Sequence, residues 1–207
     1  SEFGTVYSKA ELEELSAVCK KYGLYLFLDG ARLGYWLASE GCDVTMADLA
    51  RLTDAFYIGG TKCGALFGEA LVLGNPALQD HFRTCMKQRG DVLAKGWLMG
   101  LQFYTLFQNG LYFDLARRAD RQAMEIKAAF QKAGIPLWVD SPTNQQFAVV
   151  TRAQEAALAQ NFIFELNHAV DAAHNCIRFC TSWSTRDEEV AALIAAIESL
   201  PGCEEAK

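Results

Sequence analysis

Apolar and polar positions along the first half of the chain predict strands that alternate with helices. Residues 24–28 are five consecutive apolar side chains, a run typical of a buried parallel strand. Residues 54–58 predict a second strand, and residues 65–73 predict a strand returning along the same sheet. Helices are predicted from Ser8, which opens a capping box with Glu11, to Gly23, and near residues 31–39, 76–88 and 95–108, with a short helix that starts at Thr45.

The second half has a different pattern. A long amphipathic helix is predicted over 112–133, ended by Gly134 and Pro136. Shorter elements follow, namely strands at 146–151, 161–165 and 175–181, a helix at 152–160, and a last helix opened by a capping box at 185–188. Strands alternating with helices indicate parallel βαβ units, so we predict an α/β fold. Residues 1–109 would belong to a large domain with a mostly parallel sheet, and residues 110–207 would form a small α+β domain.

Composition and charge narrow the class of protein. The chain has 207 residues, of which 51% are hydrophobic and 21% are charged, as expected for a globular protein with a substantial core. Its net charge of −6 argues against a nucleic-acid partner, and no apolar run reaches the roughly 20 residues that a membrane span needs. Seven cysteines, without a CxxC pair or a Cys/His cluster, predict reduced thiols in the cytoplasm and no metal site.

Lys62 lies in a glycine-rich turn directly after the strand predicted at 54–58. Glycines surround it in the sequence IGGTKCGA, so little bulk would shield its amine. A lysine at the end of a strand in an open α/β sheet projects into the crevice where ligands bind. If this amine is desolvated or lies near another cation, its pKa falls and it can form a Schiff base with a carbonyl. A surface lysine in a tight turn is the alternative interpretation of this motif alone.

Asp29 directly follows the predicted buried strand. Its carboxylate would therefore point into the same crevice as Lys62. Asp29 also suits the role of N-cap for the next helix, and capping is compatible with a role in chemistry. An aspartate at a strand end, with a lysine in a turn after a neighbouring strand, is how enzymes hold pyridoxal phosphate (PLP). The carboxylate pairs with the pyridine nitrogen and the lysine carries the cofactor.

Four segments in the same order resemble the threonine aldolase family, and they extend over nearly the whole chain. These segments are LYLFLDGARLGYWLA, DLARLTDAFYIGGTKCGALFGEALVL, KQRGDVLAKGWLMGLQF and CIRFCTSW. The resemblance implies a PLP enzyme of the aspartate-aminotransferase fold, related to the β-eliminating lyases. It further implies that Lys62 forms the Schiff base, Asp29 contacts the pyridine nitrogen, Arg32 lies near the cofactor and the substrate carboxylate, and Arg178 binds that carboxylate.

The remaining site residues have structural alternatives. Arg178 lies between two apolar residues of a predicted strand and so faces the other way, where it is either an outward surface arginine or the carboxylate ligand that the resemblance implies. Thr61 could bind the cofactor phosphate or only shape the turn. Arg89 ends a predicted helix, where a positive charge is favoured anyway; the resemblance implies that it approaches the phosphate from a subunit boundary.

The resemblance implies cleavage of threonine or allo-threonine to glycine and an aldehyde by a homodimer or homotetramer. Family members are longer, so we expect this chain to be the carboxyl-terminal portion, without the phosphate loop, the ring-stacking residue and the general base. β-Elimination and hydroxymethyl transfer would use the same residues and remain open. A catalytically silent fragment that associates with partner chains is a further alternative.

Overall fold

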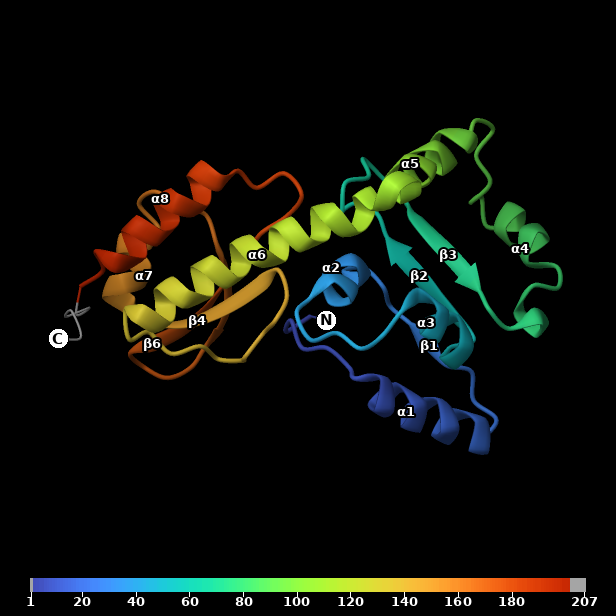
Figure 1. The fold of residues 1–207 in the computed structure, drawn as a ribbon, viewed down its shortest axis with the longest axis horizontal. Helices are drawn as coiled ribbons and strands as arrows, with labels where there is room; N and C mark the ends of the chain where they lie inside the picture. Colours follow the sequence, from blue (N-terminus) through green and yellow to red (C-terminus); the bar gives the residue numbers. More distant parts are fainter. Residues whose placement is uncertain (1, 202–207) are drawn as a thin grey trace. The chain divides into compact units, whose positions relative to one another are not determined.

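The computed structural model describes residues 2–201, which form two compact units (Figure 1). One unit is Tyr7–Asp114, and the other combines residues 2–6 with residues 115–201. The helix α6 (Leu111–Lys132) begins in the first unit and continues in the second. The division therefore falls inside a helix, whereas the sequence predicted a domain boundary just before it.

The first unit contains a sheet of three strands, β1 (Phe27–Leu28), β2 (Ala55–Gly59) and β3 (Glu69–Leu73), in that order. Strands β1 and β2 are parallel, as predicted, and β3 returns antiparallel to β2. Residues 65–68 form an irregular segment with a bend, and β3 begins only at Glu69. The helical elements of this unit are α1 (Lys9–Lys21), α2 (Leu33–Ala38), α3 (Met46–Leu52), η1 (Pro76–Leu78), α4 (Phe82–Gln88), α5 (Trp97–Phe107) and η2 (Gln108–Gly110).

The strand predicted as fully buried is short and exposed, so that prediction was wrong. Only Phe27 and Leu28 pair with β2, and Leu24, Tyr25 and Phe27 expose 59%, 63% and 57% of their surface. β1 lies at the edge of the three-stranded sheet and has one neighbouring strand within the described residues. Burial of an apolar run depends on the elements that cover it, and a sequence pattern contains no information on whether they are present.

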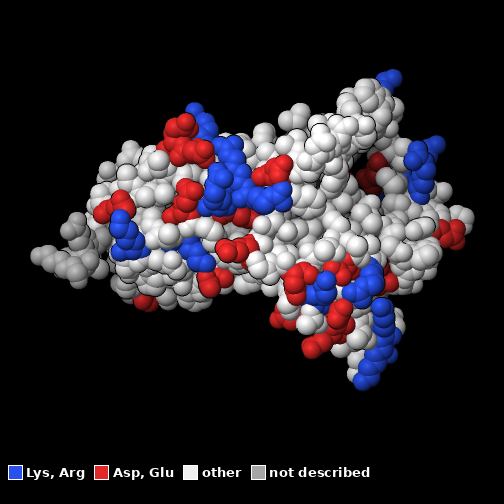
Figure 2. Space-filling model, viewed as in Figure 1, with Lys and Arg blue, Asp and Glu red and all other residues white. Residues whose placement is uncertain are grey.

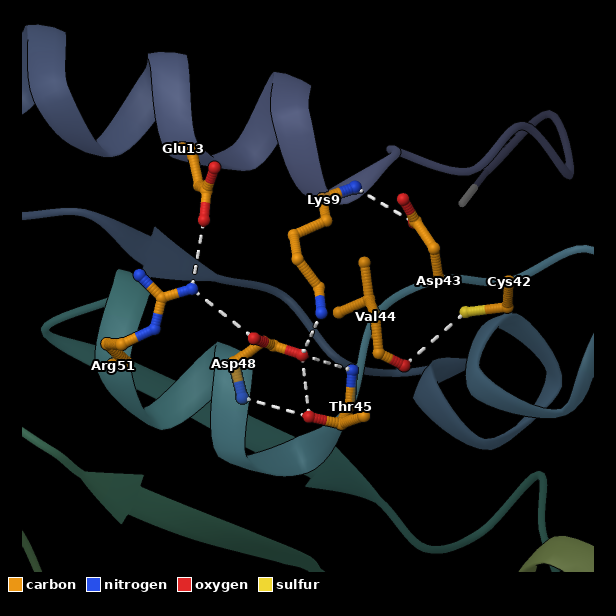
Figure 3. Close-up of polar contacts among 8 residues, drawn as sticks. All are labelled: Lys9, Glu13, Cys42, Asp43, Val44, Thr45, Asp48 and Arg51. Carbon is orange, nitrogen blue, oxygen red and sulfur yellow. Dashed lines mark hydrogen bonds and ion pairs between the residues drawn. The ribbon is translucent and has the colours of Figure 1, made fainter.

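Helices α1 and α3 are joined by a polar network that Figure 3 shows in detail. Both helices begin with a capping box, which the sequence predicted for α1. At the start of α3, Thr45 and Asp48 satisfy each other's backbone amides. The carboxylate of Asp48 also forms ion pairs with Lys9 of α1 at 3.0 Å and with Arg51 at 3.3 Å. Arg51 in turn contacts Glu13 of α1 at 3.0 Å. The hydrogen bonds that Asp48 accepts, first from Thr45 and then from Lys9 and Arg51, hold its pKa well below the ordinary value.

The second unit has an antiparallel sheet with the strand order β4 (Gln145–Thr151), β6 (His174–Cys180) and β5 (Glu165–Ala169). Its core lies on one face of this sheet, where Ile177 and Phe179 of β6 pack with side chains of α6. The helices α7 (Arg152–Leu158) and α8 (Asp187–Glu198) contribute to the same core. The arrangement is the small α+β unit that the sequence predicted.

Two elements of this unit begin at residues other than those predicted. The strand predicted at 161–165 begins only at Glu165. The last helix begins at Asp187, and its N-cap is Arg186, whose backbone amide donates to Glu189 at 3.1 Å. Thr185, the predicted cap, instead accepts a hydrogen bond from the backbone amide of Ser182. Each predicted element exists, but its first residue was misplaced.

Charges of both signs are interspersed on the face that Figure 2 shows. Within residues 2–201, no helix is long and apolar enough to cross a bilayer. Six cysteines in this range are free thiols, and Cys203 lies outside the described residues.

Candidate active site

Asp29 lies at the carboxyl end of β1, directly after the last residue that pairs with β2. Its Oδ1 accepts a hydrogen bond from the backbone amide of Ala31 at 3.0 Å. The same oxygen accepts a short hydrogen bond from the hydroxyl of Tyr57, which projects from the neighbouring strand β2. The carboxylate is therefore fixed from two sides, one on its own turn and one across the sheet.

Lys62 lies in the turn that follows β2, and this turn is tied down at several points. The carboxylate of Glu69 accepts a hydrogen bond from the backbone amide of Gly60 at 2.6 Å. The hydroxyl of Tyr112 donates to the carbonyl of Gly59 at 3.0 Å, and the hydroxyl of Tyr35 donates to the carbonyl of Lys62 itself. The backbone around Lys62 is thus anchored, while its side chain is only half-buried.

Two glycines allow the Asp29 and Lys62 segments to cross closely. The backbone amide of Gly59 donates to the carbonyl of Gly30 at 2.9 Å. A Cβ on Gly30 would lie 1.7 Å from the carbonyl oxygen of Tyr57, and a Cβ on Gly59 would lie 2.2 Å from that of Ala31. No side chain fits at either position, so glycine is required for this crossing. The crossing brings the carboxylate and the amine to the same end of the sheet.

The electrostatics of this pair favour an ionised carboxylate. The pKa of Asp29 is lowered mainly by the Tyr57 hydroxyl, then by the Ala31 amide, with a smaller contribution from the charge of Lys62. Burial, together with the adjacent carboxylate, raises the pKa of Tyr57 to about 12. At neutral pH the phenol is therefore neutral and donates a proton, and Asp29 is an acceptor with a full negative charge.

This set of groups fits PLP. An ionised carboxylate suits a protonated pyridine nitrogen, and a lysine in an anchored turn supplies the amine that would carry the cofactor. Arg32 lies at the N-cap of α2, three positions beyond Asp29, and makes no ion pair among the described residues. Its guanidinium is therefore available to an anion. Thr61 is exposed beside Lys62.

Arg89 is not brought to this site within the chain. It is the exposed C-cap of α4, and Figure 1 shows α4 well away from the end of β2. The prediction for Arg89 involves approach across a subunit boundary and stays a prediction.

Arg178 belongs to the other unit, on the sheet face opposite the core. Its side chain is 15% exposed and contacts two acceptors on neighbouring strands. Nη1 donates to Oε1 of Gln145 at 3.1 Å, and Nη2 pairs with the carboxylate of Glu165. The prediction that Arg178 points away from Ile177 and Phe179 is confirmed, since both of those side chains lie in the core.

Sequence reasoning missed Tyr57, Glu69 and the two tyrosines that anchor the Lys62 turn. Tyr57 could have been suspected, because it is a half-buried residue with a polar tip on a strand that leads directly into the glycine turn. The anchors at Tyr35 and Tyr112 give no signal in the sequence, since they come from helices that lie far from Lys62 along the chain.

The chain is similar in sequence to known proteins. The family model described as "Beta-eliminating lyase" matches residues 1–153. A low specificity L-threonine aldolase from Pseudomonas aeruginosa is 32% identical over 206 residues, which are 98% of this chain and 58% of that protein. The chain thus spans little more than half the length of the curated relatives that it matches.

The chain is also similar to solved structures. A threonine aldolase from Leishmania major is similar at a TM-score of 0.93 and 43% identity, covering 96% of this chain and 58% of that one. An aspartate aminotransferase from Thermus thermophilus is similar at a TM-score of 0.65 and 18% identity, covering 93% of this chain and 52% of that one. The second likeness supports the fold alone, which is that of the fold-type-I PLP enzymes.

Proposed function

Because this chain belongs to the β-eliminating lyase family, we propose that the complete protein is a PLP-dependent carbon–carbon lyase of the threonine aldolase type. It would cleave β-hydroxy-α-amino acids, such as threonine and allo-threonine, to glycine and an aldehyde. The support is the similarity to threonine aldolases over almost the whole chain. The observation that carries the proposal is the Asp29 carboxylate, held ionised by Tyr57 beside the anchored Lys62 turn.

In this proposal each residue of the chain has a separate task. PLP, when bound, withdraws electrons from the bond that breaks at the α-carbon. Asp29 keeps a proton on the pyridine nitrogen, because its own low pKa leaves it negatively charged. Lys62 supplies the amine that holds the cofactor. Arg178 binds the substrate carboxylate with its planar guanidinium, and Arg32 and Thr61 contribute to binding of the anionic groups.

The test is covalent attachment of PLP to Lys62. PLP would be added to the full-length natural polypeptide that contains this chain, reduced with borohydride, and located by peptide mass spectrometry. We expect the label on Lys62, none in Lys62→Ala, and unchanged labelling in the control Lys87→Ala, which removes an exposed lysine of the same unit. Label on other lysines alone, or no label, would refute the proposal and favour a catalytically silent protein.

Substrate assays then define the reaction. Release of acetaldehyde from threonine or allo-threonine supports the aldolase. Pyruvate from serine would indicate β-elimination, and transfer of a one-carbon unit from serine would indicate hydroxymethyl transfer. All three reactions use Lys62, Asp29 and Arg178, so only the products separate them.

We also propose that the protein is a homodimer or homotetramer of the cytoplasm. Helix α5 contains no charged residue, and Trp97, Leu101 and Tyr104 expose half or more of their surface. Figure 2 shows no charge over this helix. An apolar surface of this kind favours association, and the free thiols suit a reducing compartment. Approach of Arg89 to the cofactor phosphate of a neighbouring subunit belongs to the same proposal.

Light scattering would test the assembly. We expect Leu101→Glu on α5 to lower the molar mass to that of a monomer. The control Val18→Glu places the same charge on an equally exposed residue of α1 and should leave the mass unchanged. A monomeric wild-type protein would contradict the proposal.

A further inference from the structure

The guanidinium of Arg178 is held in two different ways. Gln145, which holds Nη1, is fully buried, and its Oε1 also accepts a weak hydrogen bond from the Cys180 thiol at 3.7 Å. Glu165, which holds Nη2, has a side chain that is 59% exposed. A buried neutral acceptor cannot replace a lost hydrogen bond with one to water. An exposed carboxylate can replace its ion pair with hydrogen bonds to water at little cost in free energy.

Strand register fixes both contacts. Glu165 lies directly opposite Arg178 on β5, and Gln145 lies opposite Cys180 on β4, so all four side chains share one face of the sheet. β4 and β5 are the two outer strands of this sheet, but β4 is also bridged to Leu137 at Ala148, whereas the pairing of β5 with β6 shifts between Leu166 and His168, one residue beyond Glu165. The contact of the guanidinium with Glu165 is therefore held less firmly than its contact with Gln145.

The third nitrogen of the guanidinium is unsatisfied. Nε of Arg178 is buried and makes no hydrogen bond within the described structure. A buried donor without an acceptor is costly, and an arginine binds a carboxylate best through two parallel N–H groups. Nε and Nη2 form such a pair, and Glu165 occupies only Nη2.

We propose that Glu165 is a resident counter-ion that the substrate carboxylate displaces from the Nε–Nη2 edge of Arg178, while Gln145 is the positioning residue that keeps the guanidinium oriented. The inference rests on the proposed function, because it takes Arg178 as the ligand of the substrate carboxylate. The inference adds two roles. Glu165 competes with the substrate carboxylate and so lowers its affinity, and Gln145 keeps the guanidinium of Arg178 oriented.

Binding of acetate, a bare monocarboxylate, tests this without PLP or turnover. The Arg178 Nε–H resonance of the full-length protein would be followed by NMR, with Arg178→Lys to assign it. We expect acetate to shift this resonance, with a Kd about two- to fivefold lower in Glu165→Gln, the range that an exposed ion pair provides. Glu198→Gln removes another exposed ion-paired carboxylate of the same unit and should match the wild type.

An unmoved Nε–H resonance, or an equal Kd in wild type and Glu165→Gln, would overturn the inference. These results are independent of the proposed function, whose failure would be seen as missing PLP attachment to Lys62. In the PLP-loaded protein, we expect Glu165→Gln to lower KM for threonine by the same factor and to leave kcat unchanged. A fall in kcat with no change in KM would show that Glu165 has a different role.

Gln145 is tested by the same titration. Gln145→Leu keeps the size of the side chain and removes the acceptor for Nη1. We expect weaker acetate binding, with the difference between wild type and Glu165→Gln reduced because the guanidinium is no longer oriented. An acetate Kd equal to the wild-type value in folded Gln145→Leu would remove Gln145 from the proposal.

Discussion

Asp120 of α6 is a buried carboxyl whose charge has little compensation. It is 5% exposed, and neither of its oxygens accepts a hydrogen bond of ordinary geometry in the described structure. Burial raises its pKa to about 8, and the nearby backbone amide of Asn144 offsets this only partly. We expect Asp120 to be neutral in the folded protein at pH 7 and charged in the unfolded chain.

The sign of the pH dependence follows from proton binding. Between the unfolded pKa of 3.8 and the folded pKa of about 8, the folded state binds one more proton than the unfolded state. Stability therefore falls as pH rises through this window. At about 1.4 kcal/mol per pKa unit, ionisation at this site reduces the free energy of unfolding by at most about 4 kcal/mol at pH 7, relative to pH 4.

Asp120→Asn removes this dependence. The new amide has its own buried N–H groups, which cost about 1–3 kcal/mol at every pH. The informative quantity is therefore the change of stability with pH rather than stability at one pH. We expect the variant to lose less stability than the wild type between pH 5 and pH 8, with a difference of up to about 4 kcal/mol.

Peptide-resolved hydrogen exchange in β4 and β6, corrected for the intrinsic pH dependence of exchange, measures the opening of this unit alone. The control is Asp187→Asn. The pKa of Asp187 is lowered mainly by the side chain of Gln122, so its contribution to stability is lost as pH falls rather than as pH rises. Parallel stability curves for wild type and Asp120→Asn would refute the reasoning.

Three further outcomes are expected. Phe130→Ala removes a fully buried ring from the core of the second unit and should cost about 3–5 kcal/mol in urea unfolding; a cost below about 1 kcal/mol would contradict this packing. Gly30→Ala places a Cβ on the Tyr57 carbonyl, so loss of the native near-UV circular dichroism is expected, and an unchanged spectrum would contradict the close crossing. Tyr57→Phe should raise the pKa of Asp29, measured by carbon-13 NMR of its carboxyl, and an unchanged pKa would show that the hydroxyl has no effect.

Features that depend on neighbours in the sequence could be predicted. The capping box at Ser8 was found because its two partners, Ser8 and Glu11, are three residues apart. The box at the last helix was misplaced by one residue. Thr185 and Arg186 are each followed three residues later by a glutamate. The pattern selects Thr185, because threonine is a preferred N-cap and arginine is not, and so it placed the start of the helix one residue too early.

The position of Asp29 and Lys62 at the same end of the sheet could also be predicted, since the carboxyl ends of parallel strands lie at one edge of a sheet. Their supporting residues could not. Tyr57 contacts Asp29 only because Leu28 pairs with Phe56, and that register is set by the packing of the whole unit. The exposure of β1 was missed because an apolar run predicts a tendency to be buried, not what covers it.

Sheet register determines the charge environment in both units. Tyr57 reaches Asp29 from an adjacent strand, and Glu165 reaches Arg178 from the position directly opposite on its neighbour. The two partners have opposite consequences. A neutral phenol leaves the charge of Asp29 intact, whereas a carboxylate offsets the charge of Arg178. An anion that binds Arg178 must therefore compete with a residue of the protein, but a cation that binds Asp29 need not. Under the proposed function, this difference suits Asp29 to a cofactor that stays bound and Arg178 to a substrate that is exchanged in each turnover.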